Sequence, residues 1–232
     1  MANDNRGHKY EVKIREKLLP LKLIHSKDPG SIGGKHDPDI ILSYIGTPVL
    51  IELKYNIKKV DFGQLNFKFD QTGWSVSDRC DNIEFANVLN VKGIKKFLNT
   101  NWGTKKVPKL FTKLRGEIMD LKDLKDEQKQ YKELKFKCAD NIISTYYKNK
   151  GVCYIQIGGY GLYRIEGMPQ VIPRMIPLFK PTVHIRCRVK GDDSKTQNVY
   201  WSFNGACKIE TTLEKSKYDL DKDLTFLFEK TR

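Results

Sequence analysis

The chain has 232 residues, and 42 lysines and arginines against 28 aspartates and glutamates give it a formal net charge of +14. This length is enough to bury a hydrophobic core without disulfides or a structural metal. The charge makes polyanions the expected partners; nucleic acid is the commonest of these, and a membrane surface is the competing interpretation.

Two further features bear on the compartment. No segment approaches the roughly 20 consecutive apolar residues that span a bilayer, and Met1 to Gly7 lack the apolar core of a signal peptide. The cysteines are widely spaced and form no CxxC pair, so free thiols are expected in place of zinc or redox chemistry. They are Cys80, Cys138, Cys153, Cys187 and Cys207. We therefore expect an intracellular, cytoplasmic protein without a membrane span, in the host cell if the protein is viral.

The N-terminal third reads as a helix followed by two strands. From His8 to Leu19 the apolar residues recur at helical spacing, and Pro20 ends the pattern. A loop rich in glycine and proline covers 26–37. The segments 39–44 and 48–54 are then predicted to be strands joined by a turn. Because both are almost continuously apolar, they are expected in the middle of a sheet that is covered on both faces.

The remaining elements are predicted from the same patterns. A helix is expected over Phe85–Phe97, and a helical stripe of leucines runs from Thr112 to about Tyr147. Strands are expected over 152–157, 162–165, 182–189 and 199–203, with a glycine-rich turn at 158–161. Without repeats or clear linkers, the sequence favours a single domain over 1–232. Its catalytic motifs would lie in 1–70 and its β-rich substrate-recognition part in 150–232.

One group of polar residues in the predicted strands could form a catalytic site. Asp39 opens the first strand, and Glu52 and Lys54 close the second. Residues two apart in a strand point to the same face, and a hairpin would bring Asp39 beside them. Two carboxylates can hold Mg²⁺, which phosphodiester hydrolysis needs to neutralise charge and activate water. Lys54 would polarise or deprotonate the attacking water, or stabilise the phosphorane.

The pattern acid-x-lysine alone has little value, because it recurs in this chain. It occurs in helical, polar surroundings at Glu11, Asp120, Asp123, Glu127 and Glu133. Glu52 and Lys54 taken alone would also fit an ordinary solvent-facing ion pair. Only this pair lies in an apolar strand that follows another apolar strand opened by Pro38-Asp39.

With Pro38-Asp39 and Glu52-Leu53-Lys54 together, the chain resembles the PD-(D/E)xK nuclease superfamily, which includes restriction endonucleases and archaeal Holliday junction resolvases. Arg6-Gly7-His8-Lys9-Tyr10-Glu11 is similar to the first-helix signature of the resolvases, and the glycine-rich loop 29–34 extends the likeness. The resemblance covers about the first seventy residues. It implies an α/β fold with a restriction-endonuclease-like core, a mixed central sheet flanked by helices, and a helical and β-rich C-terminal extension.

The resemblance also implies roles for individual residues. Asp39 and Glu52 would be the metal carboxylates, Glu11 an auxiliary metal or water ligand, and Lys54 the catalytic lysine. Gln64 stands where several of these families have a glutamine that contacts the site or the substrate backbone. Here Lys68 replaces the tyrosine that follows that glutamine. Glu11 also fits a solvated helix face, because Arg15 follows it by four residues.

Two groups of residues are candidates for DNA contact. Ser31, Lys35 and His36 precede the catalytic strand and would contact phosphate, unless they only make a loop soluble. Arg186, Arg188 and Lys190 alternate with apolar residues along one predicted strand. This basic face would contact phosphates or bases, or else would be the charged face of an exposed edge strand.

These patterns together predict an Mg²⁺-dependent endonuclease, with Mn²⁺ as a substitute, that cuts double-stranded DNA at specific sequences as restriction or homing enzymes do. A homodimer is expected, because two-fold symmetry supplies one site for each strand. Holliday junction resolution is an alternative activity, and RNA an alternative substrate. The alternative that is not an enzyme is a basic protein that binds nucleic acid without catalysis. The convergence of Glu11, Asp39, Glu52 and Lys54 would distinguish it from an enzyme.

Overall fold

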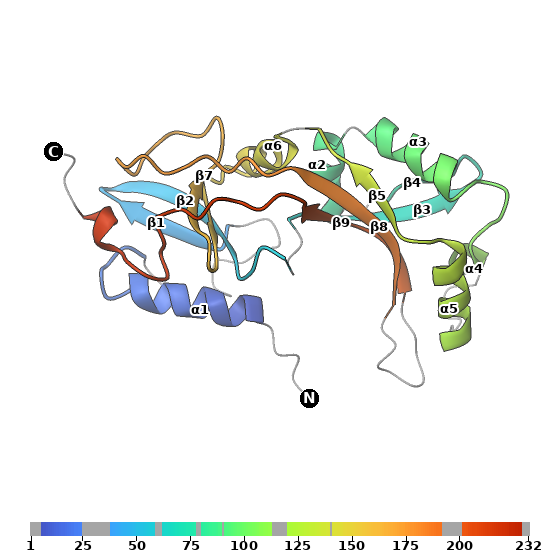
Figure 1. Ribbon diagram of the computed structural model, residues 1–232, viewed down its shortest axis with the longest axis horizontal. Coiled ribbons are helices and arrows are strands. Elements are labelled where there is room, and N and C mark those ends of the chain that lie inside the picture. Colours follow the sequence, from blue (N-terminus) through green and yellow to red (C-terminus); the bar gives the residue numbers. More distant parts are fainter. Residues whose placement is uncertain are drawn as a thin grey trace. The chain divides into compact units, whose positions relative to one another are not determined.

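A computed structural model describes residues 6–24, 38–58, 62–77, 80–89, 91–112, 120–139, 141–191 and 201–228. The chain forms two compact units, and the elements of both are labelled in Figure 1. The first unit comprises Met1–Val60, Ile143–Thr182 and Thr211–Arg232. The second comprises Asp61–Ile142 and Val183–Glu210. Each unit has its own sheet, so the protein is a mixed α/β structure.

The first unit contains a four-stranded mixed sheet of order β1-β2-β6-β7. Its strands are β1 (Ile40–Tyr44), β2 (Thr47–Lys54), β6 (Tyr154–Ile157) and β7 (Gly161–Arg164), and its helices are α1 (Arg6–Leu18), α6 (Ile142–Asn149) and the 3-10 turn η2 (Thr225–Leu227). β2 and β6 are parallel, whereas β1–β2 and β6–β7 are antiparallel pairs. The predicted mixed sheet is therefore present, with β2 inside it.

The β1–β2 hairpin fixes the register of the first unit. Ile45 and Gly46 form its two-residue turn with φ of 50° and 75°. Positive φ at both positions is what a type I′ hairpin turn requires, and its twist matches that of the strands. Tyr44 then pairs with Thr47, and Ile40 with Ile51.

The core of this unit lies between α1 and the sheet. Tyr10, Ile14 and Leu18 recur at helical spacing and are all buried. They belong to one hydrophobic cluster with Leu53 and Tyr154 of the strands. Figure 1 shows α1 running along one side of the β1–β2 hairpin. The amphipathic first helix predicted from the sequence is confirmed, and its packing holds the hairpin in place.

The second unit contains a five-stranded antiparallel sheet of order β4-β3-β9-β8-β5. The strands are β3 (Gln64–Asp70), β4 (Gly73–Val76), β5 (Leu134–Lys137), β8 (Val183–Gly191) and β9 (Trp201–Ile209). The helices are α2 (Cys80–Val88), α3 (Val91–Asn101), α4 (Lys109–Thr112) and α5 (Leu121–Gln130). Trp74 is fully buried among aromatic rings, including Trp102, Tyr131 and Phe203, which form the core of this unit.

The two faces of this second sheet differ in chemistry. Residues paired across antiparallel strands point to the same side. One side carries buried apolar residues such as Phe67, Phe203 and Ile185, and Phe97 of α3 packs there on Phe136. The opposite side, called the polar face below, is almost entirely polar in its described residues. These residues are Gln64, Asn66, Lys68, Asp70, Ser75, Lys135, Lys137, His184, Arg186, Arg188, Lys190, Ser202, Asn204 and Lys208.

Several sequence predictions need correction. The helix expected over Phe85–Phe97 is two helices, because α2 ends at Val88 and α3 begins at Val91. The helical stripe expected over 112–147 contains a strand, β5, in which Leu134 and Phe136 alternate with lysines and pair with β8. β3 and β4 were not predicted. β8 lies between β9 and β5, so the interpretation of its charged face as an exposed edge strand is wrong.

Other expectations are met. The strands predicted over 152–157 and 162–165 correspond to β6 and β7. Cys138, Cys153, Cys187 and Cys207 are free thiols. Among the helices of the described ranges, none has the length and apolar character needed to cross a membrane.

Candidate functional site

Three of the predicted site residues come together at one end of the β1–β2 hairpin. Asp39 immediately precedes β1, and continuing the register from the Ile40–Ile51 pair places it opposite Glu52. Asp39 Oδ2 accepts a hydrogen bond from the backbone N–H of Leu53 at 2.7 Å. Glu52 and Lys54 are two residues apart on β2, so their side chains point to the same side of the strand, and Leu53 points to the opposite side. The hairpin therefore gathers two carboxylates and an ammonium group.

Lys54 and Glu52 form a largely buried ion pair. The Lys54 ammonium donates a hydrogen bond to Glu52 Oε1, and the two side chains are only 17% and 8% exposed. Burial alone would lower the pKa of Lys54, but attraction to Glu52 and then Asp39 outweighs it, so the pKa is raised above its ordinary value. Lys54 is thus a cation at neutral pH.

The carboxyl groups are in an unfavourable environment for negative charge. Burial, followed by repulsion from Glu52, raises the pKa of Asp39 to about 7, although Lys54 and the Leu53 N–H act in the opposite direction. Burial also raises the pKa of Glu11 on α1, and the charges of Lys54 and Glu52 act on it. Glu11 therefore lies within electrostatic range of the site. Its carboxylate is 4.0 Å from His8 Nδ1.

The donor set fits a hard divalent cation. Asp39 and Glu52 supply carboxylate oxygens, and Mg²⁺ commonly binds one or two carboxylates while keeping waters and substrate oxygens. Burial, followed by repulsion from Glu52, raises the pKa of Asp39, and a bound cation would favour its ionised form. Within the described ranges, no three His, Cys, Asp or Glu side chains are grouped closely enough to hold one ion. Asp39 and Glu52 are thus the two carboxylates brought together here, and Glu11 lies within electrostatic range of them.

The other predicted residues lie elsewhere. Gln64 is the first residue of β3 and belongs to the second unit, where it lines a small pocket with Asn66 and Asn204. Arg186, Arg188 and Lys190 lie on the polar face of that unit. Ser31, Lys35 and His36 lie outside the described residues.

Sequence reasoning missed two residues that support the site. Arg15 of α1 is buried and donates to the backbone oxygen of Asp39, so it links the helix to the start of β1. Gln156 pairs with Leu53 across β2 and β6, and its Nε2 donates to Tyr10 at 3.1 Å and to Asp219 at 2.8 Å. A glutamine within the apolar run 154–157 was a signal that could have identified it.

The raised pKa of Asp39 predicts how stability depends on pH in the metal-free protein. Between about pH 4 and pH 7 the folded carboxyl holds a proton that the unfolded chain releases, so stability is expected to fall as the pH rises through this window. Thermal unfolding in EDTA measures this slope. Asp39→Asn should flatten it, and Mg²⁺ should stabilise the wild type more at pH 8 than at pH 5. An equal slope in wild type and Asp39→Asn would contradict the assignment.

Comparisons with known proteins identify no relative of this chain. No protein-family model, curated protein or solved structure gives a match to this chain. The functional argument therefore rests on the geometry and charge of the residues described above.

Proposed function

We propose that this chain is an Mg²⁺-dependent endonuclease that hydrolyses phosphodiester bonds in double-stranded DNA. The observation that carries the proposal is the grouping of Asp39, Glu52 and Lys54 at the end of a strand inside a mixed sheet. The first unit would then be a restriction-endonuclease-like core. Cleavage at specific sequences, by a homodimer with one site for each strand, is the form of the activity that we favour.

Each residue has a part in this chemistry. Mg²⁺ or Mn²⁺, held by Asp39 and Glu52, would neutralise charge on the phosphate and activate water. The Leu53 N–H orients the Asp39 carboxylate by binding Oδ2. Lys54 has a raised pKa and is held beside Glu52, so it acts as a fixed positive charge that stabilises the phosphorane. A role as proton acceptor is disfavoured, because it would require loss of this charge.

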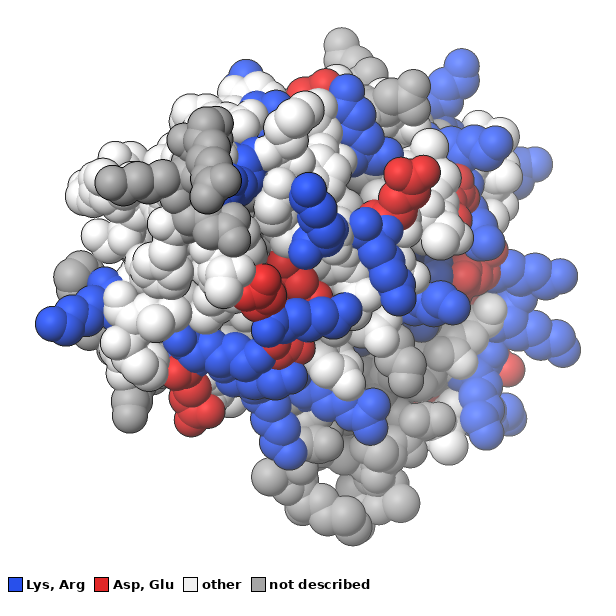
Figure 2. Space-filling model, turned by 60° about the vertical axis from the view of Figure 1, so that its left-hand side comes forward, with Lys and Arg blue, Asp and Glu red and all other residues white. Residues whose placement is uncertain are grey.

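Surface charge supports a nucleic-acid substrate. Lysine and arginine side chains spread over the surface seen in Figure 2, with fewer acids among them. Of the described residues on the polar face of the second unit, seven are lysine or arginine and one, Asp70, is an acid. Glu133 and Glu210 flank this face, 3.9 Å from Arg186 and 3.0 Å from His184. The face remains strongly basic and suits the phosphates of a duplex.

The activity is tested directly with purified protein. A duplex library, a four-way junction and a structured RNA are incubated with Mg²⁺ or with EDTA. The proposal expects Mg²⁺-dependent cuts in the duplexes, at recurring sequences. Cleavage confined to the junction would make the protein a resolvase, and cleavage confined to RNA would change the substrate. Binding without any cleavage would favour a nucleic-acid-binding protein that is not an enzyme.

The polar face makes a separate prediction about binding. Replacing Arg186 and Arg188 by alanine is expected to lower the slope of log K against log salt by about 0.9 for each phosphate that the protein no longer neutralises. Lys122→Ala with Lys125→Ala is the matched control, since both are exposed on α5 and the same charge is removed. Fluorescence anisotropy over a salt series measures both slopes. Equal slopes for the two double variants would show that the polar face does not contact the duplex.

A further inference from the structure

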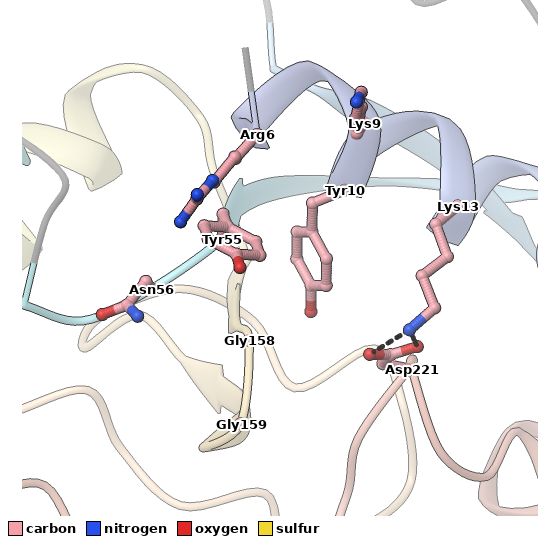
Figure 3. Close-up of a pocket in the computed structure, with 9 residues that line it drawn as sticks. All are labelled: Arg6, Lys9, Tyr10, Lys13, Tyr55, Asn56, Gly158, Gly159 and Asp221. Atoms are coloured by element: carbon pink, nitrogen blue, oxygen red, sulfur yellow. Dashed lines mark hydrogen bonds and ion pairs between the residues drawn. The ribbon is translucent and has the colours of Figure 1, made fainter. Parts of the chain in front are cut away.

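A pocket of about 470 Å³ lies in the first unit, next in sequence to the candidate catalytic residues. Two tyrosines line this pocket. In the sequence, Tyr55 directly follows Lys54 and Tyr10 directly precedes Glu11. Figure 3 shows that the pocket lies between α1, the end of β2 and the β6–β7 turn. The lining residues are Arg6, Lys9, Tyr10, Lys13, Tyr55, Asn56, Gly158, Gly159 and Asp221. Its volume is in the range of small-ligand sites.

The two tyrosines of the pocket differ in what they can do. Tyr10 is only 5% exposed, and its hydroxyl accepts a hydrogen bond from Gln156, so it forms a fixed wall. Tyr55 is 37% exposed, and its ring stands edge-on to Tyr10, with the centroids 6.0 Å apart. This contact fixes the position of Tyr55 and leaves part of its ring accessible. An accessible aromatic ring in a fixed position can stack with a nucleobase.

The β6–β7 turn forms the side of the pocket opposite α1. Gly158 donates from its N–H to the Lys54 carbonyl at 2.8 Å. A Cβ at Gly158 would come within 2.2 Å of the Tyr55 carbonyl oxygen, so this close approach requires glycine. The turn is therefore fastened to the end of β2, and Tyr55 is held on a constrained backbone.

The rim of the pocket is positively charged. Arg6, Lys9 and Lys13 follow one another on α1 at intervals of three and four residues and share one side of the helix. Lys13 forms an ion pair with Asp221 (Figure 3). Asp221 also pairs with Lys17. Among the described residues that line the pocket, Asp221 is the one acid, against three cations. Cations beside an aromatic ring and the Asn56 amide match the phosphate and the base of a nucleotide.

We propose that this pocket binds one unpaired nucleotide of the substrate strand, with its base stacked on Tyr55 and its phosphate beside Arg6 and Lys9. The inference rests on the proposed function in taking the strand as substrate. A base in this pocket has left the duplex, as when enzymes flip a base out of the stack.

The test uses three duplexes of one sequence: fully paired, with one extra unpaired 2-aminopurine nucleotide, and with an abasic unit in place of that nucleotide. Binding is measured in Ca²⁺ without Mg²⁺. The wild type should bind the 2-aminopurine duplex more tightly than the other two, and the 2-aminopurine emission should change as the base stacks. Tyr55→Leu should weaken binding of that duplex about ten- to a hundredfold, leave the paired duplex unaffected, and abolish the emission change. Tyr55→Phe should behave as wild type.

Phe228→Leu is the matched control, because Phe228 is 55% exposed in the same unit and does not line the pocket. Equal affinity for the 2-aminopurine and abasic duplexes, or wild-type binding by Tyr55→Leu, would overturn the proposal. The proposal would also be overturned if adenosine monophosphate competed for the pocket as strongly as the 2-aminopurine duplex does, since the ligand would then be a free nucleotide.

The outcomes for the pocket and for catalysis are separable. Tyr55-dependent stacking without cleavage in Mg²⁺ would sustain the pocket and defeat the nuclease. Cleavage that depends on Asp39, without any preference for the unpaired base, would support the nuclease and overturn the proposed role of the pocket.

Discussion

Replacing Asp39 by asparagine or Glu52 by glutamine is expected to lower the rate of Mg²⁺-dependent DNA cleavage by at least about a thousandfold. Each change removes a carboxylate that would hold the metal, and a metal's stabilisation of transition-state charge amounts to several kcal/mol, or about three powers of ten in rate. The amide variants preserve size. Asp39→Asn also keeps an oxygen that can accept the hydrogen bond from the Leu53 N–H. Single-turnover cleavage of a labelled duplex measures the drop in rate.

Duplex binding should survive these two changes, because neither removes a positive charge. Glu16→Gln is the matched control: Glu16 is exposed on α1, and its replacement should leave cleavage unchanged. Ca²⁺ should tighten duplex binding by the wild type and much less by Asp39→Asn, since the carboxylates repel phosphate until a cation is bound. Cleavage by either variant at close to the wild-type rate, or cleavage by the wild type in excess EDTA, would remove the basis for a metal site.

Replacing Lys54 by methionine is expected to have the second-largest effect, on both rate and stability. Loss of a fixed charge aimed at the reacting group typically costs about a hundred- to a thousandfold in rate. Removal of one partner from a buried pair also leaves the other charge uncompensated, at a cost of a few kcal/mol. Glu52 is 8% exposed and would be that charge. Repulsion from Glu52 would then be opposed less strongly, so the pKa of Asp39 would rise further.

Lys54→Arg tests what the lysine contributes. Arginine keeps the charge but does not act as a base at neutral pH, so an electrostatic role predicts that Lys54→Arg retains more activity and stability than Lys54→Met. Mg²⁺ should restore much of the stability of Lys54→Met, because a bound cation replaces the missing charge. Chemical unfolding with and without Mg²⁺ measures both effects. If Lys54→Arg were as inactive as Lys54→Met yet fully stable, proton transfer by Lys54 would become the better explanation.

The sequence predicted the parts of the fold that depend on neighbouring residues. The apolar spacing in α1 and the turn at Ile45 and Gly46 act within a few residues, and the hairpin that brings Asp39 to Glu52 follows from them. The strand order is set by distant pairings, such as that of β3 with β9, and local patterns do not encode it. The alternation in Gln64–Asp70 did mark a strand. No strand was predicted there, although Leu65, Phe67 and Phe69 alternate with polar residues.

The same limit applies to the site. Asp39, Glu52 and Lys54 were predictable because one hairpin holds them. The pocket around Tyr55 was not predictable, because two distant parts of the chain form it. They are α1 and the turn at Gly158 and Gly159. The charge alternation in β8 was recognised, but its place inside the sheet, and hence the breadth of the polar face, depended on β5 and β9.

The way the chain passes between the two units has a consequence for synthesis. Asp39, Glu52 and Lys54 are made early, yet β2 gains its parallel partner only when Tyr154–Ile157 has emerged from the ribosome. The sheet of the second unit waits longer, because β3 pairs with Trp201–Ile209. A nascent chain that ends before Trp201 therefore lacks a strand of the second unit and the segment Thr211–Arg232 of the first. At about 5–20 residues per second, translation leaves β3 without this partner for roughly 7 to 26 seconds, so its unpaired edge is open to other chains during that time.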